Sequence, residues 1–275
     1  RAEPGAVLSA ISDPGPAGKA FAEEIGVACY PGFDALPVGD YHFKNVVAWA
    51  LAGRPRGTDD EMVALLAETG VDTVALAPEA GSQRLRDLIR KGISEAQILA
   101  AAGRLAAAGI PNLRLYFLVG LPTETDEDVA AIVALTERIL HAETRGATPD
   151  AAPSRAARKP FRRVTLSVNP FIPKAATPWQ RLPLADVRAT AAKIRRIAAA
   201  LRPERSVRVI HDTPRAAYLQ ALLSLGDRRV GAILLAAHRN GGNWPRAFKE
   251  APVHPDFFVY RERPPRTPLP WAHIR

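Results

Sequence analysis

The sequence predicts an α/β protein built on a parallel sheet. Short apolar runs at residues 73–77, 113–119, 164–168 and 206–210 alternate with amphipathic helical patterns at 59–69, 82–90, 94–108, 126–142 and 184–201. This alternation is typical of βαβ units whose helices lie outside the sheet. The runs at 73–77 and 115–119 are almost wholly apolar, which predicts strands buried on both faces. Two further strands are predicted at 7–11 and 45–51.

Local signals support these helix boundaries. Thr125 is a good N-cap for the helix at 126–142, and Asp126 favours the positive end of that helix. Gly70, Gly92 and Gly109 stand where the preceding helices are expected to end.

The pattern changes after residue 210. Two helical segments are predicted at 214–225 and 229–239, followed by a turn at 240–244 and a proline-rich extended segment from 261. We therefore divide the chain into an α/β core at 1–210 and a C-terminal helical extension at 211–275. Residues 144–160 are rich in Ala, Pro and Arg without an apolar period, which predicts a loose surface insertion.

Composition narrows the function classes. The 275 residues are 47% hydrophobic and 24% charged, which is ordinary for a globular protein. No apolar run of about 18 residues and no signal peptide are present, so we expect a cytoplasmic protein without a membrane partner. The net charge is +9, and 30 of the 37 basic residues are arginine. The basic charge is compatible with an RNA partner, but the arginine excess fits a GC-rich genome as well as it fits a phosphate-binding surface.

The first of three unusual loops follows the strand predicted at 73–77. Ligands of parallel α/β folds lie at the carboxyl ends of the strands. Gly81 and Ser82 at a helix start leave backbone N–H groups free for a carboxylate or phosphate, and Glu79 could accept from ribose hydroxyls or an ammonium group. On spacing alone the simpler interpretation is favoured, in which Ser82 only caps the helix and Glu79 is solvated.

The other two loops follow the next two strands. Gly120 permits a sharp turn or the close approach of a ligand, and Pro122 stiffens that turn. A plain strand-to-helix connection is the simpler alternative. In the loop that begins at Asn169, prolines flank Phe171, which could lie against a flat ring or merely close the core.

Other chemistries lack their motifs. The six histidines are scattered, and no HExxH, paired-cysteine, GxSxG, GxGxxG or phosphate-loop pattern occurs. We therefore predict no metal ligands in this chain. Cys29 is the one cysteine, which excludes an internal disulfide and is interpreted as a small buried apolar residue.

Together the three loops resemble the radical S-adenosylmethionine (SAM) superfamily, in an uncharacterised branch that often carries a cobalamin-binding-like domain upstream. The resemblance rests on PEAGSQRLR at 78–86 with KG at 91–92, on YFLVGLPTETDEDV at 116–129 and on SVNPFIPK at 167–174. It continues into the extension at 218–223, 226–231, 256–258 and 269–271.

The resemblance implies a partial (β/α) barrel of the radical SAM type, with a C-terminal α-helical appendage, that binds SAM across its strand ends. Glu79 and Ser82 would contact the ribose or methionine part, and Lys91 would lie near the carboxylate. The adenine side would be formed by Gly120, Leu121, Pro122, Asn169 and Phe171. A four-iron, four-sulfur cluster would supply the electron that cleaves SAM into a radical acting on an unknown substrate.

The chain departs from the family at the cluster. The family binds it through CxxxCxxC, and one cysteine cannot provide three thiolate ligands. Because the chain does not begin with Met, we expect the cluster loop in a missing upstream part, and the chain alone to be inactive. A cluster-free SAM- or nucleotide-binding protein and a basic RNA-associated protein remain alternatives. Cobalamin upstream, the substrate and the oligomeric state stay open.

Overall fold

The computed structural model describes residues 60–141 and 161–272. The strands predicted at 7–11 and 45–51, the insertion predicted at 144–160 and Cys29 lie outside the described residues.

The described core is a four-stranded sheet in which every neighbouring pair of strands is parallel and the strand order follows the sequence. Its strands are β1 (Thr73–Glu79), β2 (Asn112–Val119), β3 (Arg163–Pro170) and β4 (Val207–Ile210). Parallel neighbours in sequential order require a crossover between each pair, and helices supply these crossovers. This confirms the predicted α/β class and is the arrangement of a partial β/α barrel.

Five helices accompany the sheet in the described part of the core: α3 (Asp60–Glu68), α4 (Gln83–Leu88), α5 (Glu95–Ala107), α6 (Asp126–His141) and α7 (Val187–Ala200). All five were predicted, although α7 starts three residues later than expected. The cause is Asp186, whose carboxylate caps the helix by accepting from the backbone N–H groups of Arg188 and Ala189, at 3.0 and 2.8 Å. None of the described helices is both long and apolar enough to cross a membrane.

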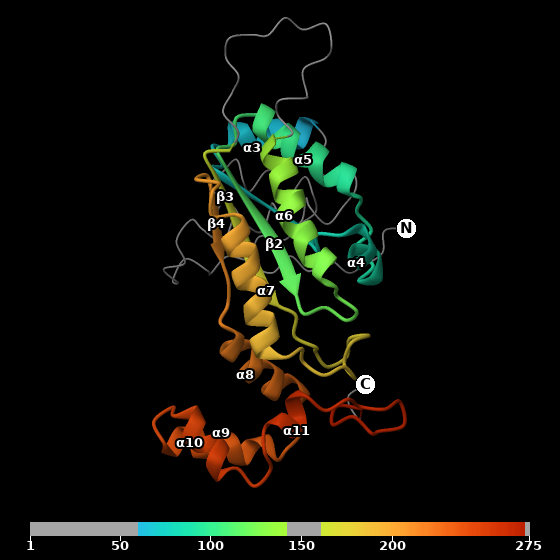
Figure 1. The fold of residues 1–275 in the computed structure, drawn as a ribbon, viewed down its shortest axis with the longest axis vertical. Coiled ribbons are helices and arrows are strands. Elements are labelled where there is room, and N and C mark those ends of the chain that lie inside the picture. Colours follow the sequence, from blue (N-terminus) through green and yellow to red (C-terminus); the bar gives the residue numbers. More distant parts are fainter. Residues whose placement is uncertain (1–59, 142–160, 273–275) are drawn as a thin grey trace, which may run out of the picture.

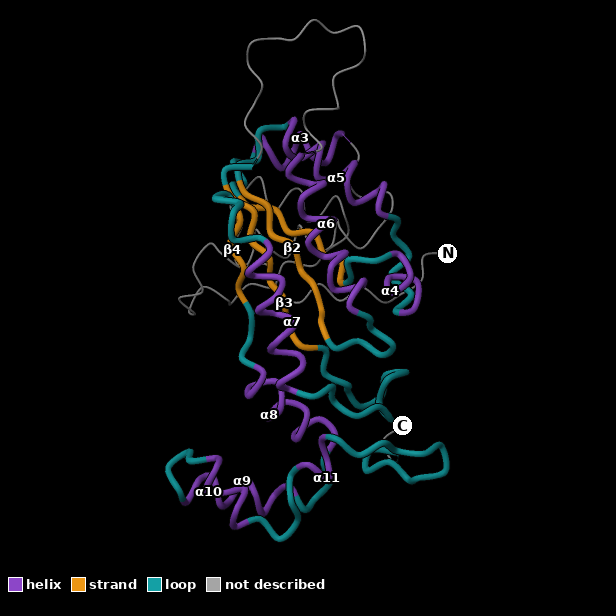
Figure 2. The backbone as a smooth tube through the Cα atoms, in the orientation of Figure 1, coloured by secondary structure: helices purple, strands orange, loops and turns teal. Residues whose placement is uncertain are grey.

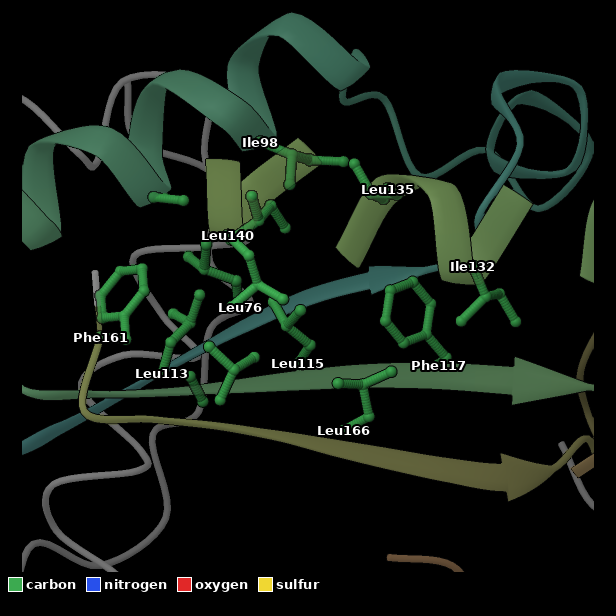
Figure 3. Packing of buried hydrophobic residues seen from close by; sticks show 14 of the residues in the cluster. Leu76, Ile98, Leu113, Leu115, Phe117, Ile132, Leu135, Leu140, Phe161 and Leu166 are labelled. Atoms are coloured by element: carbon green, nitrogen blue, oxygen red, sulfur yellow. The ribbon is translucent and has the colours of Figure 1, made fainter. Parts of the chain in front are cut away.

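Helices α5, α6 and α7 lie on one face of the sheet (Figure 1). Figure 3 shows the side chains of β2 and β3 that point toward α5 and α6, among them Leu113, Leu115, Phe117 and Leu166. All four are at most 1% exposed. Burial of these alternate side chains is the main apolar contribution to the core.

Burial on both faces was predicted for β1 and β2, and it holds only for β1. The five central residues of β1 are buried, whereas β2 alternates between buried and half-buried positions. On β2 the apolar residues Tyr116 and Leu118 are half-buried, because they project from the face opposite the helices. The apolar run at 115–119 therefore marks one buried face and one partly open face.

The helical extension follows β4 and lies beyond the carboxyl ends of the strands, at the end of the molecule opposite α3 (Figures 1 and 2). It comprises α8 (Pro214–Leu225), α9 (Val230–Arg239), α10 (Trp244–Glu250) and α11 (Asp256–Val259). The structure confirms the helices predicted at 214–225 and 229–239; α10 and α11 were not predicted. The proposed division at 210/211 falls between β4 and α8.

A buried arginine joins the parts of the extension. Arg263 is 4% exposed and donates to the carbonyl oxygens of Arg261, Leu225 and Phe258. The last two oxygens belong to α8 and α11, at or near their C-terminal ends, where carbonyls lack partners within the helix. Burial lowers the pKa of this guanidinium, but the carbonyls satisfy its donors. Arg263 therefore fixes the start of the C-terminal segment to two helices.

Gly81 allows the loop after β1 to pack directly on the backbone of α6. A Cβ atom at this position would lie 2.2 Å from the backbone nitrogen of Ile132 and 2.4 Å from the carbonyl carbon of Ala131. No side chain fits at such distances, so the absence of a Cβ sets how closely the loop approaches the helix.

We predict that Gly81→Ala destabilises the protein by about 3 kcal/mol, because the methyl group must push the loop away from α6. Gly103 in α5 is the matched control, since a Cβ there meets nothing within 4 Å. Gly103→Ala is expected to raise stability by about 0.5–1 kcal/mol through helix propensity. Urea unfolding of both variants measures the difference, and equal effects would contradict the assignment.

Candidate functional site

The loops after β1, β2 and β3 meet at the carboxyl edge of the sheet. A small cluster of buried residues joins Ala80 and Leu85 from the first loop and helix to Leu121 from the second. Phe171, in the third loop, packs against it. Residues from the three motifs are therefore neighbours in space, and two of them, Leu121 and Phe171, are predicted site residues.

Glu79 lies at the end of β1 in a backbone conformation that side chains rarely adopt. Its φ is +64°, and the register between β1 and β2 is irregular between Leu76 and Glu79. Lys91 Nζ lies 3.4 Å from its Oε1, and the two side chains are 19% and 24% exposed. Burial raises the pKa of Glu79, and the Lys91 ammonium only partly opposes this rise. The arrangement presents a loosely paired carboxylate and ammonium at the site edge.

Ser82 is held by two hydrogen bonds inside the protein. Its hydroxyl caps α4 by accepting from the Leu85 N–H at 3.3 Å and donates to Asp128 Oδ1 at 2.6 Å. This agrees with the capping interpretation. A ligand could still use the remaining lone pair of the hydroxyl oxygen, but not its proton.

Asp128 gathers groups from both of the first two loops. Besides Ser82, its carboxylate accepts from the Arg84 guanidinium and from the backbone N–H and hydroxyl of Thr125, at 2.8 and 3.1 Å. Burial alone would raise the pKa of Asp128, but these hydrogen bonds outweigh it and lower the pKa to about 2. The same Arg84 also donates to the carbonyl oxygen of Thr123 at 2.8 Å.

A second buried side chain, Arg86, holds the first loop through its backbone carbonyls. Arg86 is fully buried and donates to the carbonyl oxygens of Ala80 and Gly81, both at 2.9 Å, and to Gln83 Oε1 at 2.9 Å. Burial lowers its pKa, and Glu95, 3.9 Å away, partly offsets this. A guanidinium that binds two successive loop carbonyls fixes the path of the chain between Glu79 and Ser82.

The second loop turns sharply at Gly120, where φ is +83°. The Gly120 N–H donates to Glu124 Oε2 at 2.9 Å, and Lys193 from α7 donates to the same oxygen at 2.6 Å. A Cβ at Gly120 would point at Ala185, 3.0 Å away, so the glycine serves the turn. Leu121 is buried and Pro122 is half-buried.

Asn169 and Phe171 flank the end of β3. The Asn169 amide donates to Ser167 Oγ at 3.2 Å, and its Oδ1 accepts from the Asp212 N–H at 3.0 Å. The Phe171 ring lies edge-on to Trp179, with 6.4 Å between ring centroids and 89° between planes. Phe171 thus closes part of the apolar cluster and also stands in an aromatic pair at the site edge.

Sequence reasoning missed two groups of candidate residues. Tyr116 pairs with Ser167 in the register of β2 and β3, and both project from the face opposite the helices. Polar residues at alternate positions of otherwise apolar strands were the available signal. His211 and Asp212 follow the carboxyl end of β4, so the rule that found the other loops would have found them too.

The described residues contain no group of three His, Cys, Asp or Glu side chains that could hold a metal ion. An iron–sulfur cluster bound through CxxxCxxC needs three thiolate ligands, and this chain has one cysteine. The residues present do not fit such a cluster.

The parallel sheet, with three strand-end loops that meet at one edge, has the arrangement of a partial β/α barrel. Residues 50–136 of the chain match the radical SAM superfamily. This confirms the family that the loop motifs resemble.

The chain is also similar to two curated proteins. The chain is 35% identical over 164 residues to an uncharacterized protein of Methanocaldococcus jannaschii, covering 59% of this chain and 32% of the relative. It is 29% identical over 105 residues to an uncharacterized methyltransferase of Pyrococcus horikoshii, covering 38% and 23%. The chain therefore spans at most about a third of the length of these relatives.

We predict that Asp128→Asn destabilises the protein by about 2–3 kcal/mol at pH 7, because the amide cannot hold Arg84 as an ion pair. The folded-state pKa is about 2 and the ordinary value is 3.8, so this stabilisation is present above about pH 4 and is lost as pH falls toward 2. The variant should lack that part of the acid dependence.

Denaturant unfolding between pH 7 and pH 2.5 measures the effect. Asp126→Asn is the matched control, because Asp126 begins the same helix but is 71% exposed in its ion pair with Arg196. A wild-type protein and an Asp128→Asn variant with parallel stability curves would contradict the role of Asp128.

Proposed function

We propose that the carboxyl edge formed by the first three loops binds SAM, and that the chain is the SAM-binding part of a radical SAM enzyme acting on an unidentified substrate. The match of residues 50–136 to the radical SAM superfamily supports this function. The observation that carries the proposal is the Glu79–Lys91 pair, held beside the shared apolar cluster of the three loops.

The charges of the pair complement the amino-acid end of SAM. That end carries one ammonium and one carboxylate, so Glu79 would accept from the ammonium and Lys91 would donate to the carboxylate. The 3.4 Å separation of Lys91 from Glu79 is long for a charge-assisted hydrogen bond, which favours exchange of partners. A bound ammonium would also lower the raised pKa of Glu79 by stabilising its charged form.

The apolar cluster suits the adenosine end. Leu121 and Phe171 come from different loops, and Phe171 offers an aromatic ring beside the strand ends. Gly120 and Pro122 set the course of the second loop, and Asn169 supplies an amide. Ser82 would accept from a ribose hydroxyl, because its own proton is donated to Asp128.

We assign this chain no electron-transfer step, because its one cysteine cannot hold the cluster that cleaves SAM in the family. The same count favours, as a second candidate function, SAM binding without radical chemistry. Since one relative is named a methyltransferase, transfer of the SAM methyl group is the reaction to test first, with formation of S-adenosylhomocysteine as its readout.

We predict that Lys91→Met weakens SAM binding about tenfold, because the ligand carboxylate loses a charged donor. Lys91→Arg should retain most of the affinity, and adenosine, which lacks the carboxylate, should bind wild type and Lys91→Met equally. Calorimetry at pH 7.5 measures each affinity. Lys249→Met is the control, because Lys249 is an exposed lysine in the extension.

A wild-type chain that binds neither SAM nor adenosine would overturn the proposed function. Equal losses of SAM and adenosine affinity in Lys91→Met would instead move Lys91 away from the carboxylate. Unchanged SAM affinity in that variant would remove Lys91 from the site.

A further inference from the structure

The C-terminal segment 259–271 is bound along the third loop by a series of polar contacts. The Leu184 N–H donates to the Val259 carbonyl at 2.9 Å, and the Arg263 N–H donates to the Arg181 carbonyl at 3.1 Å. Trp271 Nε1 donates to Gln180 Oε1 at 2.6 Å. These contacts join residues about 75 to 91 positions apart in sequence, so the loop and the segment order one another.

Gln180 is the central acceptor of this arrangement. Its Oε1 accepts from Trp271 and also from the Ala176 N–H at 3.1 Å. Ala176 has a φ of +59°, which is strained for a residue with a side chain. Such a conformation persists only where the surroundings hold it, and the side-chain oxygen Oε1 of Gln180 is one of the groups that hold it.

Arg181 makes the second polar link. One of its terminal nitrogens donates to the carbonyl oxygens of Pro264 and Thr267, at 2.8 and 3.0 Å. Arg263, in the same segment, is buried and donates to backbone carbonyls of α8 and α11. The segment is therefore a fixed support for the loop.

The supported loop carries the aromatic pair of the site. Trp179 precedes Gln180 directly, and its carbonyl accepts from the Leu182 N–H at 2.9 Å. Its ring contacts Phe171 edge-on, and Phe171 is tied to β2 through its N–H, which donates to the Val119 carbonyl at 2.8 Å. A displacement of Gln180 would therefore displace Trp179 against Phe171.

We propose that segment 259–271 is a positioning element of the site: through Gln180, Arg181 and Trp271 it sets the Phe171–Trp179 pair that receives the adenine ring. The adenine part rests on the proposed function. The ordering of the third loop by the extension does not depend on it. The extension, which lies outside the matched residues 50–136, thereby becomes part of the ligand site.

Four variants of the whole chain test this inference. Trp271→Phe keeps an aromatic ring but removes the donor to Gln180. Gln180→Met removes the acceptor at similar size, whereas Gln180→Glu keeps it. Trp244→Phe is the matched control, because Trp244 packs in the same apolar cluster as Trp271 and lies remote in sequence from the third loop.

Two readouts separate positioning from general stability. Hydrogen exchange of the backbone amides at 171–182, measured without ligand, should rise about fivefold in Trp271→Phe and Gln180→Met. Affinity for adenosine and SAM should fall by a similar factor of about five in both. Gln180→Glu keeps the acceptor oxygen, so its exchange rates and its affinities should equal those of the wild type. Trp244→Phe should change neither property.

Unchanged exchange in Trp271→Phe and Gln180→Met would overturn the inference. Faster exchange with unchanged adenosine affinity would overturn the link between the loop and the ligand. If the wild-type chain binds neither ligand, the proposed function fails, and exchange alone then decides whether the segment orders the loop.

Discussion

The carboxylate of Asp128 is the interaction on which the candidate site depends. It lies at the start of α6, yet it binds the serine that caps α4, the arginine that follows it and the threonine before its own helix. Strand order alone brings the loops after β1 and β2 to one edge. The buried carboxylate then fixes them in one arrangement, since a displaced loop would leave a charged group without its partners.

Gly81 and Arg86 determine how the first loop packs against α6. The loop passes against the backbone of α6, where no Cβ fits, and its carbonyls point at a buried guanidinium. Glu79 adopts its left-handed conformation within this constraint. In this loop, burial raises the pKa of the Glu79 carboxyl, which lies beside Lys91.

The sequence predicted the four described strands, their parallel sheet and seven of the described helices, because apolar period and capping residues are local signals. Helices α10 and α11, with seven and four residues, were not predicted. The motifs placed Glu79, Gly120 and Phe171 correctly at strand ends. The contacts of Asp128 with Ser82 and Arg84 could not be predicted, because they join segments that are distant in sequence. Arg84 and Asp128, for example, are 44 residues apart.

The edge of the sheet is held by two kinds of chemistry that respond differently to acid. The first two loops share a carboxylate, which accepts a proton as pH falls toward 2. The third loop is held by Arg181, which donates to the backbone carbonyls of Pro264 and Thr267, and these acceptors carry no charge that acid could remove. Acid would therefore release the first pair of loops from each other while the aromatic side of the edge stayed in place. The type of hydrogen-bond acceptor therefore sets which contacts of the site are lost first in acid.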